Sequence, residues 1–400
     1  MIPVLALLWT LLAIWFWWWQ ASVAPRSGEA VEQAYRAFTS TSHFRGLDGL
    51  RAISVIAVIW THVTGPHTLE LLNHGNKGVD LFFAISGFLV TTLLLKERRR
   101  TNSISLRNFY IRRTLRIFPL YYAVLALYCV LVFVAMHGTP KATEFWQNVP
   151  AFATYTSNWF VSADNSADHG VTFYFAWSLA TEEQFYLFWP PLLVASLARG
   201  RRFWLPALLA LALVSVQVAM SGVHADGLLT TALASLAPAI LFGAALAVLL
   251  DNRTGFQWLA PVLGQRYVPA ALAILLLVCL QFGAPGLLVS LVMAVLVASV
   301  CLRQDSVLDP VLSCTPLAFV GAISYGMYLM HMLAANAVRK LVGHPMGADV
   351  FVGTLVLVVV MASISHRWFE TPVLRLKSRF SAPQPMAGMA PVVPSAGTAA

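Results

Sequence analysis

Long apolar runs constrain this chain more than any other feature of its sequence. Ten of them follow one another with short connections, and an eleventh precedes them at residues 2–24. The ten runs lie at 47–66, 78–95, 118–136, 172–198, 203–220, 229–250, 267–283, 285–302, 317–338 and 349–366. A helix of roughly 20 apolar residues crosses the hydrocarbon core of a bilayer. The sequence therefore predicts an all-α, polytopic transmembrane helical bundle, with a ten-helix core plus one extra N-terminal hydrophobic helix.

The composition agrees with a chain that lies in a lipid bilayer. Hydrophobic residues make up 58% of the 400 residues and charged residues only 11%, whereas a soluble domain carries roughly a quarter charged residues. The net charge of +9 does not indicate nucleic-acid binding, because no basic stretch lies on a soluble domain of its own. The four cysteines are scattered, with no CxxC pair, so neither a disulfide framework nor a metal site is expected.

Lys and Arg collect in alternate connections between the runs. If the run at 47–66 begins in the cytoplasm, the inside connections hold 22 of the 26 basic residues. The positive-inside rule therefore predicts this orientation, with 137–171 outside. We expect a multi-pass protein of the plasma (inner) membrane. The excess of Arg over Lys and the abundance of Ala, Leu and Val favour a bacterial source.

Three regions follow from these patterns. Residues 1–43 comprise the extra hydrophobic segment and a cytoplasmic linker, 44–380 form the membrane domain, and 381–400 are uncharged and rich in Pro, Ala, Gly and Met. We expect that last region to be a disordered tail. The segment at 2–24 is either a retained helix or a signal peptide, because small residues follow it. The absence of a basic stretch before it agrees better with a retained helix.

Two titratable residues lie in the first run of the core. Arg51 and His62 are eleven residues apart, which places both on one helix face with an axial rise of about 16 Å between them. Such residues are functional candidates, because a charge inside a membrane is costly. Arg51 would hold an anionic group near the cytoplasm, and His62 would meet the reactive end of an extended donor such as a pantetheine thioester. Alternatively, Arg51 is an interfacial anchor and His62 hydrogen-bonds a neighbouring helix.

Charged residues on the next two helices extend this candidate site. Asp80 begins its helix at the level of His62, where a carboxylate either orients the imidazole or complements the helix dipole. Arg113 and Arg116 are three residues apart and therefore neighbours on one face. Their forked donors suit the phosphates of coenzyme A, although anionic lipid headgroups are an alternative.

Two adjacent acids lie about ten residues into a helix that enters from outside. Each carboxylate costs a few kcal/mol at the bilayer centre, so at least one of Glu182 and Glu183 is expected to face a polar cavity. Successive helical residues point about 100° apart, so the two acids do not easily share one role. Glu182 or Glu183 would assist His62 as a base, or stay protonated and donate a hydrogen bond.

A last candidate group lies in the run at 317–338. Tyr325, Tyr328 and His331 recur at three-residue spacing, and therefore lie on one side of a helix. We interpret them as an acceptor site or a structural site.

Six stretches, taken in order, resemble the acyltransferase 3 family, the membrane acyltransferases typified by O-antigen acetylases. The similarity runs from Phe44 to Pro372. The stretches are LDGLRA followed by His62, GVDLFFAISGFL, FYIRRTLRIFPLYY, WSLATEEQFYLFWP, ISYGMYLMH and SHRWFETP. Two features depart from the pattern: the extra segment at 2–24, and His366 and Thr371, which replace an aromatic and a basic residue that are commoner there.

The resemblance implies a ten-helix membrane core that takes an acyl group from acyl-CoA as the donor substrate. We expect the acyl group to be acetyl. It implies an acceptor hydroxyl on a saccharide, lipid-linked sugar or glycoside, and no tightly bound cofactor. The family's essential histidine corresponds to His62 and its arginine to Arg51. Its basic RxxR motif corresponds to Arg113 and Arg116, and its glutamate to Glu182. Some members also carry a soluble esterase-like domain, and no stretch of this sequence is expected to form one.

The leading hypothesis is an acyl-CoA-dependent O-acyltransferase in which His62 acts as a base or as an acyl relay. One alternative is a transporter of acyl groups or sugars, which would typically show inverted repeats; no clear repeat is found in the sequence. The other alternative is a catalytically inactive assembly partner, which the presence of both Arg51 and His62 disfavours.

Overall fold

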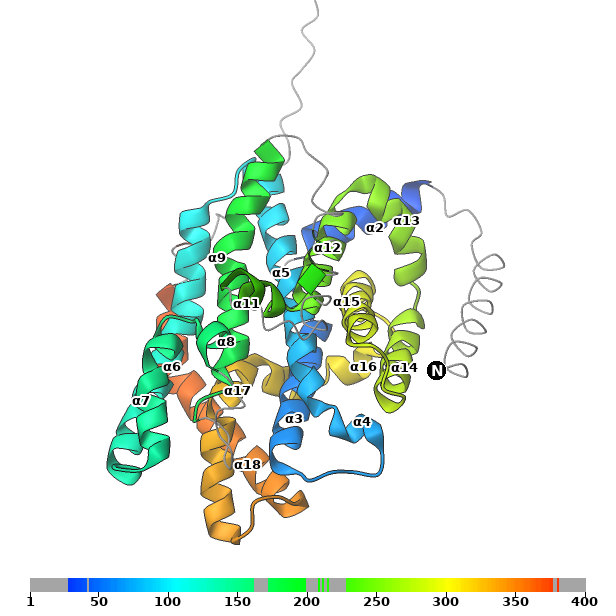
Figure 1. The fold of residues 1–400 in the computed structure, drawn as a ribbon. Coiled ribbons are helices and arrows are strands. Elements are labelled where there is room, and N and C mark those ends of the chain that lie inside the picture. The colour runs from blue at the N-terminus through cyan, green and yellow to red at the C-terminus, as the bar shows by residue number, and fades with distance from the viewer. Residues whose placement is uncertain are drawn as a thin grey trace, which may run out of the picture.

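The computed structural model describes residues 28–161 apart from 42, then 172–198 and 228–376, with a few single positions between and beyond. Every regular element within these ranges is a helix, and Figure 1 shows the long helices packed together as a bundle. The all-α prediction is confirmed. The predicted segment at 2–24, most of 203–220 and the predicted tail at 381–400 lie outside the described residues.

The helices, in chain order, are α2 (Gly28–Ser40), α3 (Gly46–Val63), α4 (Glu70–Asn73), η1 (Gly75–Lys77), α5 (Gly78–Thr101), α6 (Leu106–Ala135), α7 (Pro140–Ala153), α8 (Ser157–Phe160), α9 (Ala176–Ala198), α11 (Leu228–Ala234), α12 (Pro238–Asp251), α13 (Arg253–Leu263), α14 (Val268–Gln281), α15 (Gly286–Leu302), α16 (Asp309–Leu312), α17 (Thr315–Val342), α18 (Ala348–Ser365), η3 (His366–Glu370) and α19 (Thr371–Arg375).

Five helical stretches of the described chain are long and apolar enough to cross a membrane. They are Gly46–Val63, Gly75–Thr101, Leu106–Ala135, Thr315–Val342 and Ala348–Arg375. A sixth span results if α12 and α13, which meet at a bend of 110°, are counted as one. The chain is thus a multi-pass helical protein by length and composition, and the count of ten plus one stays a prediction.

Two predicted runs differ from the helices that form. The run at 229–250 divides into α11 and α12, because Pro238 lacks an N–H group for continuing a helix and instead begins the next one. The run at 118–136 is only the second part of α6, which begins at Leu106 with a cap from the Ser105 side chain. The basic stretch before that run therefore forms the first turns of a 30-residue helix.

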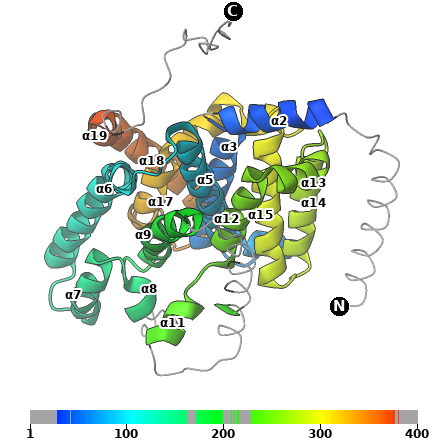
Figure 2. The ribbon, with the colours of Figure 1, turned by 90° about the horizontal axis from the view of Figure 1, so that it is seen from above.

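Small residues bring the central helices close together. A side chain at Gly87 of α5 would overlap the carbonyl oxygen of Ile240 in α12, and one at Gly243 of α12 would overlap that of Ala84 in α5. Glycines at a crossing allow two backbones to approach closely in a membrane bundle. Figure 2 shows α5 beside α12 and α15 in the middle of the bundle.

Helices α2 and α13, which belong to connections predicted to be cytoplasmic, lie side by side at one end of the bundle (Figure 1). Tyr35 of α2 donates a hydrogen bond to the carbonyl oxygen of Asp251 at 2.8 Å, and Glu32 of α2 pairs with Arg253 at 3.2 Å. Lys96 of α5 is only 4% exposed. Its ammonium group donates to the carbonyl oxygen of Thr41 at 2.7 Å and lies over the Phe38 and Phe44 rings.

Helix α4, which belongs to a connection predicted to be outside, lies toward the opposite end of the bundle (Figure 1). The Leu71 amide donates to the side chain of Gln281 at 3.2 Å. The Gly347 amide donates to the carbonyl oxygen of Val63, the last residue of α3, at 3.0 Å. The orientation of the chain across the membrane stays a prediction.

Candidate active site

A cavity of about 670 Å³ lies among α3, α5, α6, α9 and α17. It extends from His43 and Asp48, at the end where α2 lies, to Val79 and Phe82 in the first turns of α5. The volume is typical of a small-molecule site. Six cationic and three acidic side chains line it: Arg51, Lys96, Arg100, Arg112, Arg113, Arg116, Asp48, Glu97 and Glu182.

The arginines of the cavity differ in how their charge is satisfied. Arg51 donates to Asp48, one turn before it, at 2.9 Å, and Arg112 pairs with Glu97 at 2.9 Å. The guanidinium of Arg113 lies over the Tyr186 ring, 4.8 Å from its centroid.

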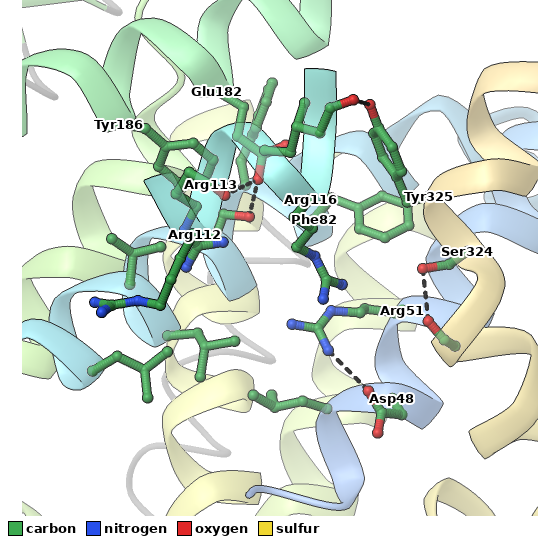
Figure 3. A pocket seen from close by; sticks show the side chains of 18 of the residues that line it. Asp48, Arg51, Phe82, Arg112, Arg113, Arg116, Glu182, Tyr186, Ser324 and Tyr325 are labelled. Atoms are coloured by element: carbon green, nitrogen blue, oxygen red, sulfur yellow. Dashed lines mark hydrogen bonds and ion pairs between the residues drawn. The ribbon is translucent and has the colours of Figure 1, made fainter. Parts of the chain in front are cut away.

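Arg116 has a different environment, because it forms no ion pair or hydrogen bond with any residue that the structure describes. Figure 3 shows its guanidinium directed at that of Arg51 inside the cavity. Two cations that face each other in a cavity form a site for an anion, since an anion between them offsets their repulsion.

Glu182 lies farther along the cavity and is held by two hydroxyl groups. Ser86 of α5 and Tyr186 of α9 both donate to its Oε1 atom. Sequence reasoning did not assign Ser86 and Tyr186 to the site. The sequence could have indicated Tyr186, because a residue four positions after Glu182 lies on the same helix face. The contact with Ser86 depends on how α5 and α9 pack, which no local pattern indicates.

Glu183 is not among the residues that line the cavity, whereas Glu182 is. Its surroundings are the tyrosines of α6, the α7–α8 connection and α17. The two adjacent acids thus point to different environments, as their helical spacing predicts.

His62 lies in the last turn of α3, beyond the end of the cavity that Val79 and Phe82 form. Its Nδ1 atom is 2.8 Å from the carbonyl oxygen of Val58. A carbonyl oxygen only accepts, so in the neutral ring Nδ1 carries the hydrogen and the lone pair is on Nε2. This is the tautomer that a base or nucleophile acting through Nε2 requires.

The link from the cavity to His62 runs through α17. Tyr328 lines the cavity, its ring centroid is 5.5 Å from that of His331, and His331 is 4.9 Å from His62 in an edge-to-face contact. The Tyr328 hydroxyl and the Ser178 hydroxyl are hydrogen-bonded at 2.6 Å. Tyr325 also lines the cavity and donates to the carbonyl oxygen of Ile117 at 2.7 Å.

Asp80 lies in the first turn of α5 and pairs with Lys77 at 2.9 Å. The ion pair joins Asp80 to its own helix start, so the contacts of this structure favour the helix-terminus interpretation over orientation of His62. In the described ranges no cluster of three or more His, Cys, Asp or Glu side chains is placed to hold a metal ion.

Comparisons with known proteins show the family of this chain. A family model described as an acyltransferase domain matches residues 44–366. The O-acetyltransferase OatA of Staphylococcus aureus strain NCTC 8325 / PS 47 is 29% identical in an alignment of length 357 that covers 84% of this chain and 58% of OatA. YrhL of Bacillus subtilis strain 168, provisionally named a peptidoglycan O-acetyltransferase, is 28% identical in an alignment of length 366 that covers 84% of this chain and 56% of YrhL.

A provisionally named O-acetyltransferase of Staphylococcus aureus strain COL is 28% identical in an alignment of length 371 that covers 85% of this chain and 59% of that protein. The chain thus spans less than two thirds of the length of these relatives. No solved structure matches it. The family model covers most of the chain, including the whole of α3, α5, α6, α9 and α17 that surround the cavity, so the chain belongs to the acyltransferase 3 family.

Proposed function

We propose that this protein is an integral membrane O-acyltransferase that moves an acyl group from cytoplasmic acyl-CoA to a saccharide hydroxyl. We expect the acyl group to be acetyl. The observation that carries the proposal is the cavity in which Arg116 faces Arg51. Phosphate groups suit such a pair, because guanidinium groups bind phosphate oxygens through two parallel hydrogen bonds.

The cavity has the polarity that an extended acyl-CoA requires. Its arginines lie toward the end of the bundle where α2 lies, whereas Val79 and Phe82 form the end of the cavity that is farthest from α2. The phosphates would bind among the arginines and the pantetheine arm would extend inward. The thioester would then lie beside Tyr328, one histidine ring away from His62.

His62 supplies the base in this proposal. Its Nε2 lone pair removes the proton of the acceptor hydroxyl as the hydroxyl oxygen attacks the thioester carbonyl. A C–O bond forms, the C–S bond breaks, and the proton leaves with the thiol. A positioned base of this kind typically contributes roughly 10²–10⁴-fold to a rate. Glu182, held by Ser86 and Tyr186, supplies a fixed negative or hydrogen-bonding group beside the donor.

The acceptor class comes from the relatives. OatA and YrhL are named for O-acetylation, and the printed name of YrhL specifies peptidoglycan. We therefore propose a saccharide or glycoconjugate of the cell envelope as the acceptor and the plasma membrane as the location.

Radiolabelled acetyl-CoA, given to membranes that contain the protein and an envelope polysaccharide fraction, tests the proposal. His62→Ala should lose transfer by about 10²-fold or more while keeping its expression and its binding of acetyl-CoA. His62→Gln should not restore transfer, because an amide does not take up the proton. His137→Ala is the matched control, since His137 is an exposed histidine far from the cavity lining. Transfer by His62→Ala within a few-fold of the unaltered protein would show that another group is the base.

A further inference from the structure

His331 has an unusual environment for a histidine that only packs. Its side chain is completely buried, among the rings of Phe175, Tyr328 and His62 at centroid distances of 5.2, 5.5 and 4.9 Å. Its Nε2 atom is buried without a hydrogen-bond partner in the described structure. A buried polar atom without a partner is destabilising, so a position with a purely packing role would favour an apolar side chain.

The hydrogen bonds of the two histidines assign both lone pairs. The Nδ1 atom of His331 is 2.5 Å from the carbonyl oxygen of Tyr328, as Nδ1 of His62 is 2.8 Å from that of Val58. A carbonyl oxygen cannot donate, so both neutral rings carry hydrogen on Nδ1 and a lone pair on Nε2. Neither Nε2 atom carries a hydrogen at rest, so no hydrogen bond joins the two rings, and a single added proton would supply the hydrogen that such a bond needs.

We propose that His331 is a positioning residue for the proton-transfer step: it accepts a hydrogen bond from His62 once His62 is protonated. The inference rests on the proposed role of His62 as the base. The acceptor hydroxyl gives its proton to Nε2 of His62, and the N–H so formed is shared with Nε2 of His331. When the C–S bond breaks, the proton returns through His62 to the thiolate, so that neither ring is changed overall.

The surroundings explain why one proton, and not two, is held by the pair. Two positive charges about 5 Å apart repel strongly away from water. Arg339 adds a further cation, because its guanidinium donates to the carbonyl oxygen of His62 at 2.5 Å. The pair is therefore neutral in its resting state and singly protonated during transfer.

Two variants of His331 test the proposal in the acetyl-transfer assay. His331→Phe keeps an aromatic ring but removes the lone pair, so kcat should fall by about tenfold or more with the KM for acetyl-CoA within twofold. His331→Gln offers an amide oxygen as acceptor and should retain more activity than His331→Phe. The unfolding midpoint of His331→Phe in detergent should be unchanged or higher, because the unpartnered nitrogen is gone. His137→Phe is the control for the assay.

The outcomes separate this inference from the proposed function. Activity of His331→Phe within threefold of the unaltered protein would overturn the role of His331 in proton transfer. So would a loss accompanied by a lower unfolding midpoint and weaker acetyl-CoA binding, which is the result that a packing role gives. If the unaltered protein transfers no acetyl group, the proposed function itself fails. If His62→Ala retains transfer, the role of His62 as the base fails, and this inference fails with it. If only the His331 variants retain transfer, the proposed function and the role of His62 stand and the pairing is wrong.

Discussion

Arg116 faces Arg51 across the cavity, yet only Arg51 has a carboxylate partner, Asp48, among the residues that the structure describes. Both belong to helices whose bounds the family model includes. Glu370 interacts with Arg116 electrostatically but forms no direct ion pair with it. An arginine without a direct partner inside a membrane protein is costly, and a bound phosphate would offset that cost. Arg116 is therefore the arginine whose removal should affect donor binding most directly.

Replacement of Arg116 by Gln should weaken binding of acetyl-CoA by about tenfold or more, because a hydrogen bond to a charged group contributes roughly 1.5–3 kcal/mol. Arg116→Lys should restore part of the affinity, since lysine keeps the charge without the fork. Equilibrium binding of labelled acetyl-CoA to the purified protein measures this. Arg253→Gln, on the exposed ion pair with Glu32, is the control. Unchanged affinity in Arg116→Gln would favour a lipid headgroup as the partner of this arginine.

Glu182 receives hydrogen bonds from both Ser86 and Tyr186. Glu182→Gln should lower kcat by about tenfold or more, because the amide oxygen can still accept from both hydroxyls but the side chain can no longer carry a negative charge. Tyr186→Phe should lower kcat less, since Ser86 still holds the carboxylate. Initial rates of acetyl transfer measure both variants. Equal activity of Glu182→Gln and the unaltered protein would exclude a role for this acid in the reaction.

The two ends of the bundle should lie on opposite sides of the membrane. Single cysteines at Ser103, after α5, and at Thr143, in α7, both at exposed positions, should react with an impermeant maleimide from opposite sides of oriented vesicles. The native cysteines are first replaced, because Cys129 and Cys314 are partly exposed. Labelling of both positions from one side would contradict the predicted orientation.

Gly87 lies where α5 crosses α12, and a methyl group there would overlap the carbonyl oxygen of Ile240. Gly87→Ala should therefore destabilise the folded protein by about 1–3 kcal/mol, the usual cost of overpacking. Gly286→Ala is the matched control, since nothing lies within contact distance of a side chain there. Unfolding in detergent, followed by circular dichroism, measures both. A midpoint for Gly87→Ala equal to that of Gly286→Ala would mean that the crossing can relax.

Hydrophobicity made the all-α membrane fold predictable, and spacing placed Arg51 and His62 on one helix. The same patterns could not show where a run divides. The break before Pro238 and the 110° bend between α12 and α13 depend on tertiary packing as well as on composition. A window of mean hydropathy averages over such breaks, so it predicts one span where the structure forms two short helices.

Six of the residues predicted from the sequence line the cavity, but their arrangement was not predictable; they are Arg51, Arg113, Arg116, Glu182, Tyr325 and Tyr328. The two adjacent acids indicated Glu182, yet its partner Ser86 lies 96 positions earlier in the chain, on another helix. The three-residue spacing indicated Tyr328 and His331, but not the contact of His331 with His62. Contacts between helices depend on rotation and tilt, which a single sequence pattern leaves open.

The contacts of Lys96 have a consequence for the response of the protein to ionic strength. Its ammonium group is buried against the Phe38 and Phe44 rings and donates to a carbonyl oxygen, so salt screens its contacts less than those of an exposed pair. The ion pair between Glu32 and Arg253 is exposed, and at 1 M salt, where the screening length is about 3 Å, it contributes little. In concentrated salt, the first turns of α2 should therefore lose this ion pair, whereas its last turn should stay packed beside Lys96 and the entrance of the cavity.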